Sequence, residues 1–443
     1  MAGDGRASPK SSAPGADARS ETAIDAFAKS LRLLRTRRFG TFCVASLLSN
    51  LGTWAQQVAE PWLLLSLGAS SFLIGLDSFA MAAPYWILTL VGGVLADRAD
   101  RRRVIAVCQS IQMLCPAVLV GLLISGTVRP WMVIGLSTIV GVTDALSMPS
   151  FSSIVPSIVE PRQIASALAL NATQFNLSRI LGPALAGVVM ASVGAVGCFA
   201  LNAASYLPFI WVAIWILPRR SRRRSLEAPF DRKHFFAGIR EIAASPHLRG
   251  ALLTVLLTSM FCGPLIVFCP VLVKTVLKGD VGDFSTAIGA FGLGGLLGAV
   301  ALLGVTPGRD RRRISSWFAA GYGFVVVAVA LNATVWALPL LLMAAGLAMT
   351  VSNTSANSLL QGTAAPRLRG ETASLYQLAM RGGLSIGSLL TGLCVSGFGI
   401  RLALLVNGMV AVAAQCAVLR LWLEGSDDDT NGSDPVARAS ANR

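Results

Sequence analysis

Charged residues are scarce in this chain of 443 residues, because Asp, Glu, Lys and Arg make up only 13% of it whereas apolar residues make up 54%. The mean hydropathy is +0.66. A soluble protein of this length needs far more charge to cover its surface, whereas a surface that faces hydrocarbon needs almost none. The composition therefore excludes an ordinary soluble domain and predicts a protein embedded in a lipid bilayer.

Histidine and paired cysteine are also scarce. The chain has two histidines, His234 and His247, and eight cysteines that fall singly within apolar stretches. It has no CxxC pair, no HExxH motif and no GxxxxGK loop, which argues against a zinc centre, a disulfide framework and a nucleotide site. We therefore expect no metal, no cofactor, no enzymatic activity and no pumping driven by ATP.

Acidic residues are outnumbered, and the net charge is +15. The basic residues form short clusters between apolar segments and do not line one soluble face, so we expect no nucleic-acid partner. Loops rich in Lys and Arg stay on the cytosolic side of a membrane. Alternate loops are basic, at residues 32–38, 98–103, 162, 219–224, 309–313 and 367–369. This alternation predicts a multi-pass membrane protein with cytosolic termini, and we expect it in the bacterial inner membrane.

Long apolar runs, in contrast, are abundant. A helix needs about 20 apolar residues to cross the hydrocarbon core. Twelve segments have that length, at residues 39–67, 70–95, 103–126, 130–156, 163–192, 195–217, 249–273, 282–305, 314–333, 335–361, 371–397 and 400–423. The predicted fold class is an all-α polytopic membrane protein.

A long polar connection divides the twelve segments into two sets of six. We predict five parts: a disordered cytosolic tail at 1–30, an N-terminal six-helix half at 31–217, a cytosolic linker at 218–248, a C-terminal six-helix half at 249–423 and a second disordered tail at 424–443. Apolar residues recur at helical spacing within the linker, at Phe235, Phe236, Ile239 and Ile242. They indicate either a helix on the membrane surface or a packed linker helix.

The two sets of six resemble each other. Residues 161–187 can be laid over residues 366–392 without a gap, and an arginine precedes the first shared glycine in both copies. The aligned pairs are Pro161 with Pro366, Arg162 with Arg367, Gly182 with Gly387, and Gly187 with Gly392. Two six-helix repeats are a recurring plan of transporters, with the substrate site between the repeats near the bilayer midplane.

Two segments, SNLGTWAQQVAEPWLLLSLGASS (49–71) and GGVLADRADRRRVI (92–105), give the chain a family likeness. It resembles the major facilitator superfamily, and specifically the transmembrane secretion effector branch, which is similar to enterobactin exporters and macrolide efflux proteins. The resemblance extends over residues 31–423. It implies two pseudo-symmetric six-helix halves, proton antiport of a siderophore-like metabolite or drug, and a monomer.

The most specific motif of this resemblance is the basic loop after the second segment. Its members are Gly93, Asp97, Arg98, Arg101 and Arg102, and Asp100 replaces the usual second glycine. Gly93 would allow close helix packing, and Asp97 could meet a helix N-terminus or an arginine as a conformational latch. The alternative is that these arginines only fix the topology.

A second motif lies in the fifth segment and resembles one associated with exporters of the superfamily. It consists of Arg179, Gly182, Pro183 and Gly187. Pro183 removes a backbone donor and bends the helix, while the glycines allow close packing. The motif favours antiport, although a bend with no bearing on the direction of transport is the alternative.

Ionisable residues inside membrane spans are costly and usually face a cavity or each other. Glu60 and Asp77 lie about equally far from the turn between the first two segments, roughly 10 Å at 1.5 Å per residue. Two carboxylates at one depth can raise each other's proton affinity, as a proton-coupled exporter requires. Glu60 is the first candidate, because polar residues accompany it, whereas Asp77 could instead meet interfacial water.

Three further charges fall at mid-depth. Asp144, also a proton-coupling candidate, and Arg179 could form a structural ion pair, whereas Arg381 has no acidic partner in its half and could contact an anionic or polar substrate or bond to carbonyl groups. The residues expected to line the substrate cavity are Asn50, Trp54, Gln57, Asn171, Gln174, Asn176, Arg179, Asn357 and Arg381. Segments three, six, nine and twelve have no interior acid or base, as the resemblance implies for outer supporting helices.

Taken with the resemblance, these features predict a secondary transporter that exports a small organic molecule in exchange for protons. The expected partners are that substrate, protons and the lipid bilayer. Uptake by the same fold is the main alternative, because the fold serves both directions. A non-transporting membrane sensor or assembly factor is the alternative from a different class.

Overall fold

The computed structural model describes residues 32–217, 244–303, 311–364 and 369–432, and all of their regular structure is helical. The predicted linker helix at 235–242 and the tail at 1–30 lie outside these residues. Helices suit a bilayer because they satisfy their backbone hydrogen bonds internally, where hydrocarbon offers no partner.

The first six long helices follow the predicted segments to within a few residues. They are α2 (Arg37–Ser66), α3 (Ser71–Arg98), α4 (Arg101–Ile124), α5 (Pro130–Ile154), α6 (Ile164–Val193) and α7 (Ala195–Trp215). The remaining helices are α9 (Pro246–Leu257), α10 (Pro264–Val271), α11 (Val281–Leu303), α12 (Arg311–Leu331), α13 (Leu338–Thr363), α14 (Arg369–Phe398) and α15 (Ile400–Gly432). α15 therefore continues past residue 423, the predicted end of the span, and no proline interrupts the chain before Pro435.

α9 and α10 belong to one long rod that contains two π-helical stretches, Thr258–Cys262 and Leu272–Val276. Pro264 follows the first stretch and has no backbone N–H to donate. The Tyr322 hydroxyl of α12 donates to the Cys262 carbonyl at 3.2 Å. A side chain thus satisfies a backbone group at an irregular turn.

Ten helices of the described residues are long and apolar enough to cross a membrane, counting the α9–α10 rod as one. Two of the twelve predicted segments, those of α2 and α3, are not among the ten. Most side chains at the end of α3 lie outside the part of the chain that the structure describes, whereas α2 contains Asn50, Gln56, Gln57 and Glu60. Polar side chains of this kind lower the mean hydropathy of α2, and the structure turns them inward, as described below.

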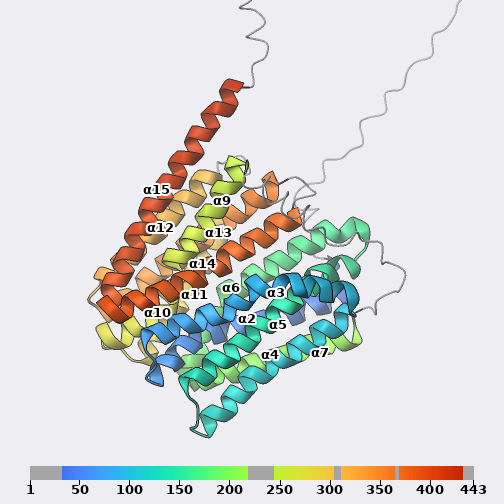
Figure 1. Ribbon diagram of the computed structural model, residues 1–443, viewed down its shortest axis with the longest axis horizontal. Coiled ribbons are helices and arrows are strands. Elements are labelled where there is room, and N and C mark those ends of the chain that lie inside the picture. Colours follow the sequence, from blue (N-terminus) through green and yellow to red (C-terminus); the bar gives the residue numbers. More distant parts are fainter. Residues whose placement is uncertain (1–31, 218–243, 304–310, 365–368, 433–443) are drawn as a thin grey trace, which may run out of the picture.

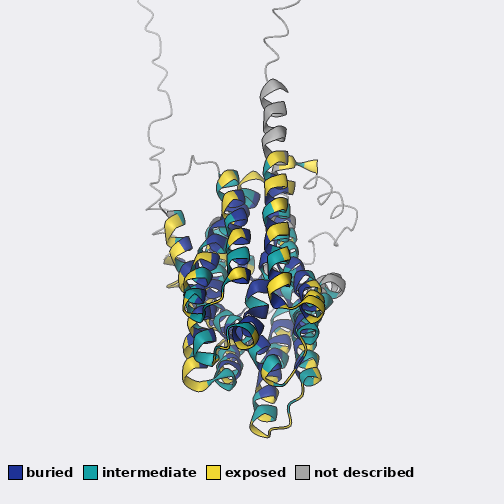
Figure 2. Cartoon of the chain, turned by 90° about the vertical axis from the view of Figure 1, so that its left-hand side faces the viewer, coloured by how far each residue is buried: buried dark blue, intermediate teal, exposed yellow. Residues whose placement is uncertain are grey.

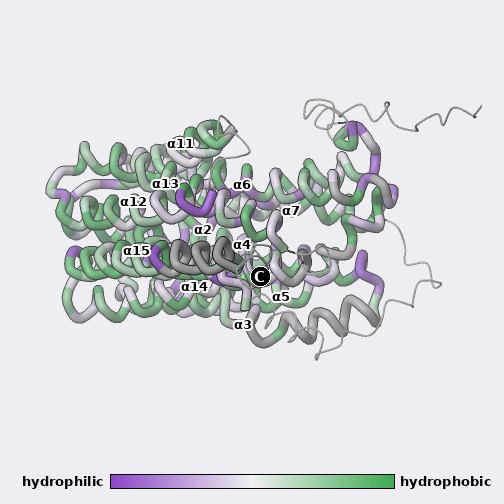
Figure 3. The backbone as a smooth tube through the Cα atoms, turned by 90° about the horizontal axis from the view of Figure 1, so that it is seen from above, coloured by the Kyte–Doolittle hydropathy of each residue, from purple (hydrophilic) through white to green (hydrophobic). Residues whose placement is uncertain are grey.

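By their order in the chain we call α2–α7 the first helix group and α9–α15 the second, and Figure 1 shows the blue-to-green helices beside the yellow-to-red ones. Across the boundary, α3 lies along α14, α6 along α11, and α2 against α10. Large apolar side chains such as Trp211, Trp317 and Phe324 are exposed on the outside of the bundle. Exposed residues lie mainly on its outer faces (Figure 2), and apolar residues run along most of the helix lengths (Figure 3). Such a surface suits lipid.

The bundle has two ends, which we call the distal and the terminal end. The distal end holds the short turns at 67–70, 125–129, 277–280 and 332–334 together with Gly194 and Gly399, whereas α2 begins and α15 ends at the terminal end. Gly194 and Gly399 each join two helices as a single residue, with φ angles of 78° and 83°. Glycine adopts such angles without steric cost.

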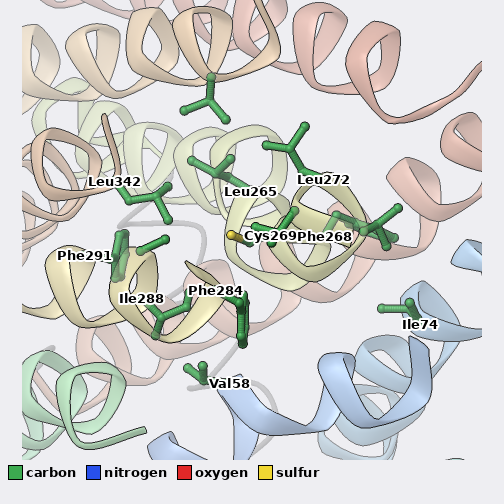
Figure 4. Packing of buried hydrophobic residues seen from close by; sticks show 14 of the residues in the cluster. Val58, Ile74, Leu265, Phe268, Cys269, Leu272, Phe284, Ile288, Phe291 and Leu342 are labelled. Atoms are coloured by element: carbon green, nitrogen blue, oxygen red, sulfur yellow. The ribbon is translucent and has the colours of Figure 1, made fainter. Parts of the chain in front are cut away.

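The buried cores differ between the two ends. One large apolar cluster occupies the distal end and draws on both groups, with Val58 and Ile74 from one facing Phe284 and Phe268 from the other (Figure 4). Towards the terminal end there are two smaller clusters, one around Phe39 and Phe209 and another around Leu360 and Tyr376, and Phe175 of α6 packs against the second one at mid-depth. The two groups are therefore joined at the distal end and at mid-depth, and have separate cores towards the terminal end.

Candidate functional site

α2 carries the polar residues of the N-terminal group inward. It packs against α6 and α7 on one side and against α10 on the other, so few of its faces meet lipid. Polar side chains on such a helix need partners, because an unpaired buried polar group is costly. The neighbouring helices supply such partners.

The first charged site is a pair of carboxyl groups. Glu60 of α2 and Asp77 of α3 are 5% and 6% exposed. The hydroxyl of Ser137 on α5 donates to Glu60 Oε1 at 2.5 Å, and Gln56 forms a further side-chain hydrogen bond to Glu60. Asp77 interacts with both Glu60 and Ser137, and its Oδ1 is buried without a hydrogen-bond partner among the described residues. The structure thus brings two of the three proton-coupling candidates together around one hydroxyl.

A small pocket opens beside this carboxyl pair. Its lining residues are Thr53, Gln56, Gln57, Glu60, Met81, Ser137, Val140, Asn202 and Tyr206. The Asn202 amide donates to Gln56 Oε1 at 2.7 Å, and the hydroxyls of Thr53 and Tyr206 lie 3.2 Å apart. Gln57, predicted to line the substrate cavity, lies here with its amide nitrogen 4.0 Å from Met81 Sδ.

The lining contains no lysine, arginine or histidine. A carboxylate that is buried without a cation is expensive, whereas a protonated carboxyl group can donate a hydrogen bond. The lining therefore offers the carboxyl groups amides and hydroxyls as partners, and no cation. Among the residues described, no group of three or more His, Cys, Asp and Glu is placed to hold a metal.

The second charged site joins the two helix groups. Nη1 of Arg381 on α14 lies 2.5 Å from Asp144 Oδ2 on α5, and both side chains are a little under one-third exposed. The Arg381 guanidinium also lies over the ring of Tyr85 on α3, 5.9 Å from its centroid. The predicted ion pair between Asp144 and Arg179 is therefore wrong, because Asp144 pairs with Arg381 instead. Asp144 reaches across to the other group because α5 lies against α3, which in turn lies along α14.

Arg179 itself is only 5% exposed. Its Nη1 lies 3.0 Å from the sulfur of Met380 on α14, whereas Nε and Nη2 are buried without a hydrogen-bond partner among the described residues. A thioether is a weak acceptor. Arg179 therefore faces the other helix group with most of its donor capacity unused.

The remaining cavity candidates split into packing contacts and residues near Arg179. The Asn50 amide donates to Gln174 Oε1 at 3.4 Å, and Gln174 donates to Asn171 Oδ1 at 3.3 Å. The first bond joins α2 to α6, and the second lies within α6. Asn176 donates to its own helix at Ala172. Trp54 packs edge-on against Phe175. Asn357 is half-buried on α13.

Only part of the basic-loop motif has described side chains. The side chains of Gly93, Asp97 and Arg98 lie outside the described residues, so the latch stays a prediction. Asp100 caps α4 by accepting from the Arg102 backbone N–H at 3.1 Å, and Arg102 Nη1 donates to the Ile214 carbonyl of α7 at 2.8 Å. Arg101 begins α4. The acid that replaces the usual glycine is thus a helix cap.

The glycines of the α6 motif are sites of close helix approach. A Cβ at Gly182 would collide with the Cβ of Trp54 on α2, and a Cβ at Gly187 would come within 2.6 Å of the Ser285 carbonyl oxygen on α11. Pro183 lies inside α6 between them. The two glycines therefore allow α6 to pack closely against α2 of the first group and α11 of the second.

Several residues of these sites were not predicted from the sequence. Ser137, Asn202 and Tyr206 join the carboxyl cluster, and Tyr85 and Met380 contact the arginines. Ser137 carried no signal, because a single serine in a span is common. The run of polar residues Thr350, Ser352, Asn353 and Ser355 within the apolar sequence of α13 is a stronger signal for buried polar contacts. All four residues are buried in the structure.

Comparison with known proteins gives a family. The family model described as "Transmembrane secretion effector" matches residues 28–441. The staphyloferrin A transporter of Staphylococcus aureus is 26% identical over 369 residues, which cover 81% of this chain and 90% of that protein. The enterobactin exporter EntS of Shigella boydii is 26% identical over 238 residues, 52% of this chain and 55% of that protein.

Solved structures share the fold at lower identity. A bacterial homologue of the human lysosomal transporter Spinster, in an inward-facing and unoccupied conformation, has a TM-score of 0.67 at 15% identity, over 88% of this chain and 98% of that one. The nucleoside transporter NupG has a TM-score of 0.66 at 12% identity, over 87% of this chain and 99% of that one.

Proposed function

Because the chain belongs to the transmembrane secretion effector family, and so is a membrane transporter of the major facilitator type, we propose that it exports a small organic molecule in exchange for protons. The observation that carries this proposal is the buried pair of Glu60 and Asp77, which share Ser137 beside a pocket whose lining contains no lysine, arginine or histidine. An enzyme has no support in the family or in its structural relatives, which are transporters.

The mechanism that we propose is alternating access by two six-helix halves, α2–α7 and α9–α15, related by pseudo-symmetry. Matching contacts support it. Gly182 meets α2 and Gly187 meets α11 in one half, while the aligned Gly387 meets Met260 and Gly392 meets α3 in the other. The single-residue links at Gly194 and Gly399 also correspond. Each glycine pair therefore approaches equivalent helices.

We further propose that the distal end faces outward and the terminal end faces the cytosol of a bacterial cell, in its plasma membrane. The basic loops support this orientation, since those before α2 and after α3 lie at the terminal end. The shared distal core and the separate terminal cores then correspond to a state that is closed to the outside. Rocking of the halves around the midplane would open the distal end and close the terminal end.

Proton exchange is assigned to the carboxyl pair. In the protonated form the pair can remain buried, since a carboxyl proton can bridge acceptor oxygens. Release of the proton leaves a negative charge on α2 and α3, which favours a state in which water reaches the pocket. α3 also packs along α14, so a shift of α3 would displace α14 in the opposite half.

The ion pair between Asp144 and Arg381 supplies the second element of the cycle. It connects α5 to α14 across the halves at mid-depth. A partly exposed pair of this kind stabilises the state in which it forms and must lengthen when the halves rock at that level. We assign it the role of holding the observed state until cargo or protons shift the balance.

Siderophore-like metabolites are the first cargo class to test, because the relatives include a transporter of staphyloferrin A and an exporter of enterobactin. Drugs are the second class. Solute uptake is the alternative direction, and a non-transporting sensor is the alternative from another class. As in the resemblance, a monomer is the expected working unit.

The test compares small molecules inside cells and in the medium by mass spectrometry, with and without the gene, under iron-replete and iron-starved growth. Export predicts one compound that leaves the medium and accumulates in cells when the gene is deleted. An unchanged profile would reject a dedicated metabolite exporter. A compound that instead accumulates in the medium would establish uptake.

A further inference from the structure

Arg179 is a buried cation without a counter-ion among the described residues. The side chain is 5% exposed, two of its nitrogens have no hydrogen-bond partner there, and the third faces a thioether sulfur at 3.0 Å. The acid that could have neutralised it, Asp144, is bonded to Arg381 instead. A guanidinium in a dry site ordinarily has a carboxylate or phosphate partner, because its desolvation is otherwise uncompensated.

A second buried donor lies on α14, one turn before the Met380 that Arg179 contacts. The Tyr376 hydroxyl is buried without a hydrogen-bond partner in the described part of the chain, and Tyr376 precedes Met380 by one turn on the same face of α14. Both residues belong to one apolar cluster, against which Phe175 of α6 packs. Phe175 precedes Arg179 by one turn of α6 and contacts the ring of Trp54. Phe175 thus lies next to both the cluster that contains Tyr376 and the turn of α6 that carries Arg179.

We infer that Arg179, assisted by Tyr376, binds the carboxylate of an organic anion, which takes the place of the Met380 sulfur. An arginine offers a planar fork of N–H donors that matches the two oxygens of a carboxylate, whereas a thioether is a weak acceptor that gives way readily. The rings of Phe175 and Trp54 would hold an apolar or aromatic part attached to the carboxylate. The inference rests on the proposed transport function and names the substrate class of that transport.

The position of the site explains how cargo could drive the cycle. Arg179 comes from one helix group and Tyr376 from the other, so a bound carboxylate would bridge them. A ligand shifts a conformational equilibrium only through different affinities for the two states. A site whose two sides separate during rocking meets that condition. The carboxyl pair of Glu60 and Asp77 lies elsewhere in the α2–α7 group, so cargo and protons occupy different places.

The experiment uses the purified full-length chain in detergent and follows its melting temperature with benzoate, benzamide and inorganic phosphate at constant ionic strength. Benzamide has the shape of benzoate without its charge, and phosphate separates a general anion effect from a carboxylate site. We expect a saturable rise with benzoate, no rise with benzamide, and at least about tenfold weaker benzoate binding in Arg179→Gln, a loss of the size expected for a charge-assisted contact.

Matched variants keep the test decisive. Arg401→Gln removes a guanidinium that donates to the Asn332 carbonyl at the distal end, and should bind benzoate like the unaltered chain. Tyr376→Phe deletes only the hydroxyl and should weaken benzoate binding several-fold. Arg179→Met removes the unpaired charge and should melt no lower than the unaltered chain without ligand, so it replaces Arg179→Gln if that variant does not fold.

Benzoate binding that survives in Arg179→Gln or Arg179→Met, equal binding of benzamide, or no saturable response to benzoate would each overturn the inference. Proton-driven flux in liposomes separates this result from the proposed function. Flux that persists without benzoate binding would support the proposed transport function and reject the carboxylate site. Binding that depends on Arg179 in a protein that moves no solute would support the carboxylate site and reject the proposed function.

Discussion

At the scale of single residues, proton coupling depends on Glu60 and its neighbours. Glu60→Gln keeps the shape and the hydrogen-bonding capacity of the side chain but cannot exchange a proton. We expect proton-driven export to fall at least about tenfold, equivalent to about 1.4 kcal/mol in the limiting step, with little change in folding. Transport into liposomes under an imposed pH gradient measures the effect.

Glu160→Gln is the matched control, because Glu160 is an exposed carboxylate in the connection before α6. It should transport like the unaltered chain. Glu60→Gln that retains full coupling to the pH gradient would remove Glu60 from the proton path.

Ser137 is the hydroxyl shared by the two carboxyl groups. Ser137→Ala should cost about 1–3 kcal/mol of stability, because it leaves a buried Glu60 oxygen without its partner. Thermal unfolding in detergent checks this, with Ser125→Ala in the exposed turn after α4 as the control. Equal melting of the two variants would mean that the Ser137 hydrogen bond contributes little.

Residue-level prediction from the sequence succeeded where distance along a helix decides the answer and failed where tertiary packing decides it. Equal spacing from one turn was sufficient to place Glu60 and Asp77 at one depth. The partner of Asp144 was not predictable in this way, because it lies on α14, 237 residues away along the chain. Asn202 and Tyr206 were overlooked because the resemblance assigns the sixth segment a supporting role.

At the scale of helices, the glycines of α6 and α14 set how closely the two groups approach. A Cβ at Gly187 would meet the Ser285 carbonyl and the backbone of Gly289. Gly187→Leu should therefore force α6 away from α11 and favour the state that is open at the distal end. Distances between spin labels placed at the distal ends of α6 and α11 should increase.

Gly121→Leu is the control for that variant, because a Cβ at Gly121 has open space around it. Unchanged distances in Gly187→Leu would show that the contact between α6 and α11 tolerates the added volume.

The bounds of the helices were predictable because the thickness of the hydrocarbon core fixes their length. The contacts of the glycines were not, since they depend on which helix of the other group lies opposite.

At the scale of the whole molecule, the ion pair between Asp144 and Arg381 links the two groups. Asp144→Asn and Arg381→Gln should each lower stability, and the double variant should lose less than the sum of the two. The expected coupling is about 0.5–3 kcal/mol, the usual range for contacting residues. Melting of the four proteins gives this value. Strict additivity would mean that the pair does not stabilise the observed state.

The central claim is that export is coupled to protons through the carboxyl pair. The most direct measurement places the purified chain in liposomes that contain a pH-sensitive dye, without an imposed pH gradient, and adds the exported compound on one side. We expect a proton flux that accompanies the compound in the opposite direction and disappears in Glu60→Gln. Movement of the compound without proton flux, or proton flux that is unchanged in Glu60→Gln, would contradict this coupling.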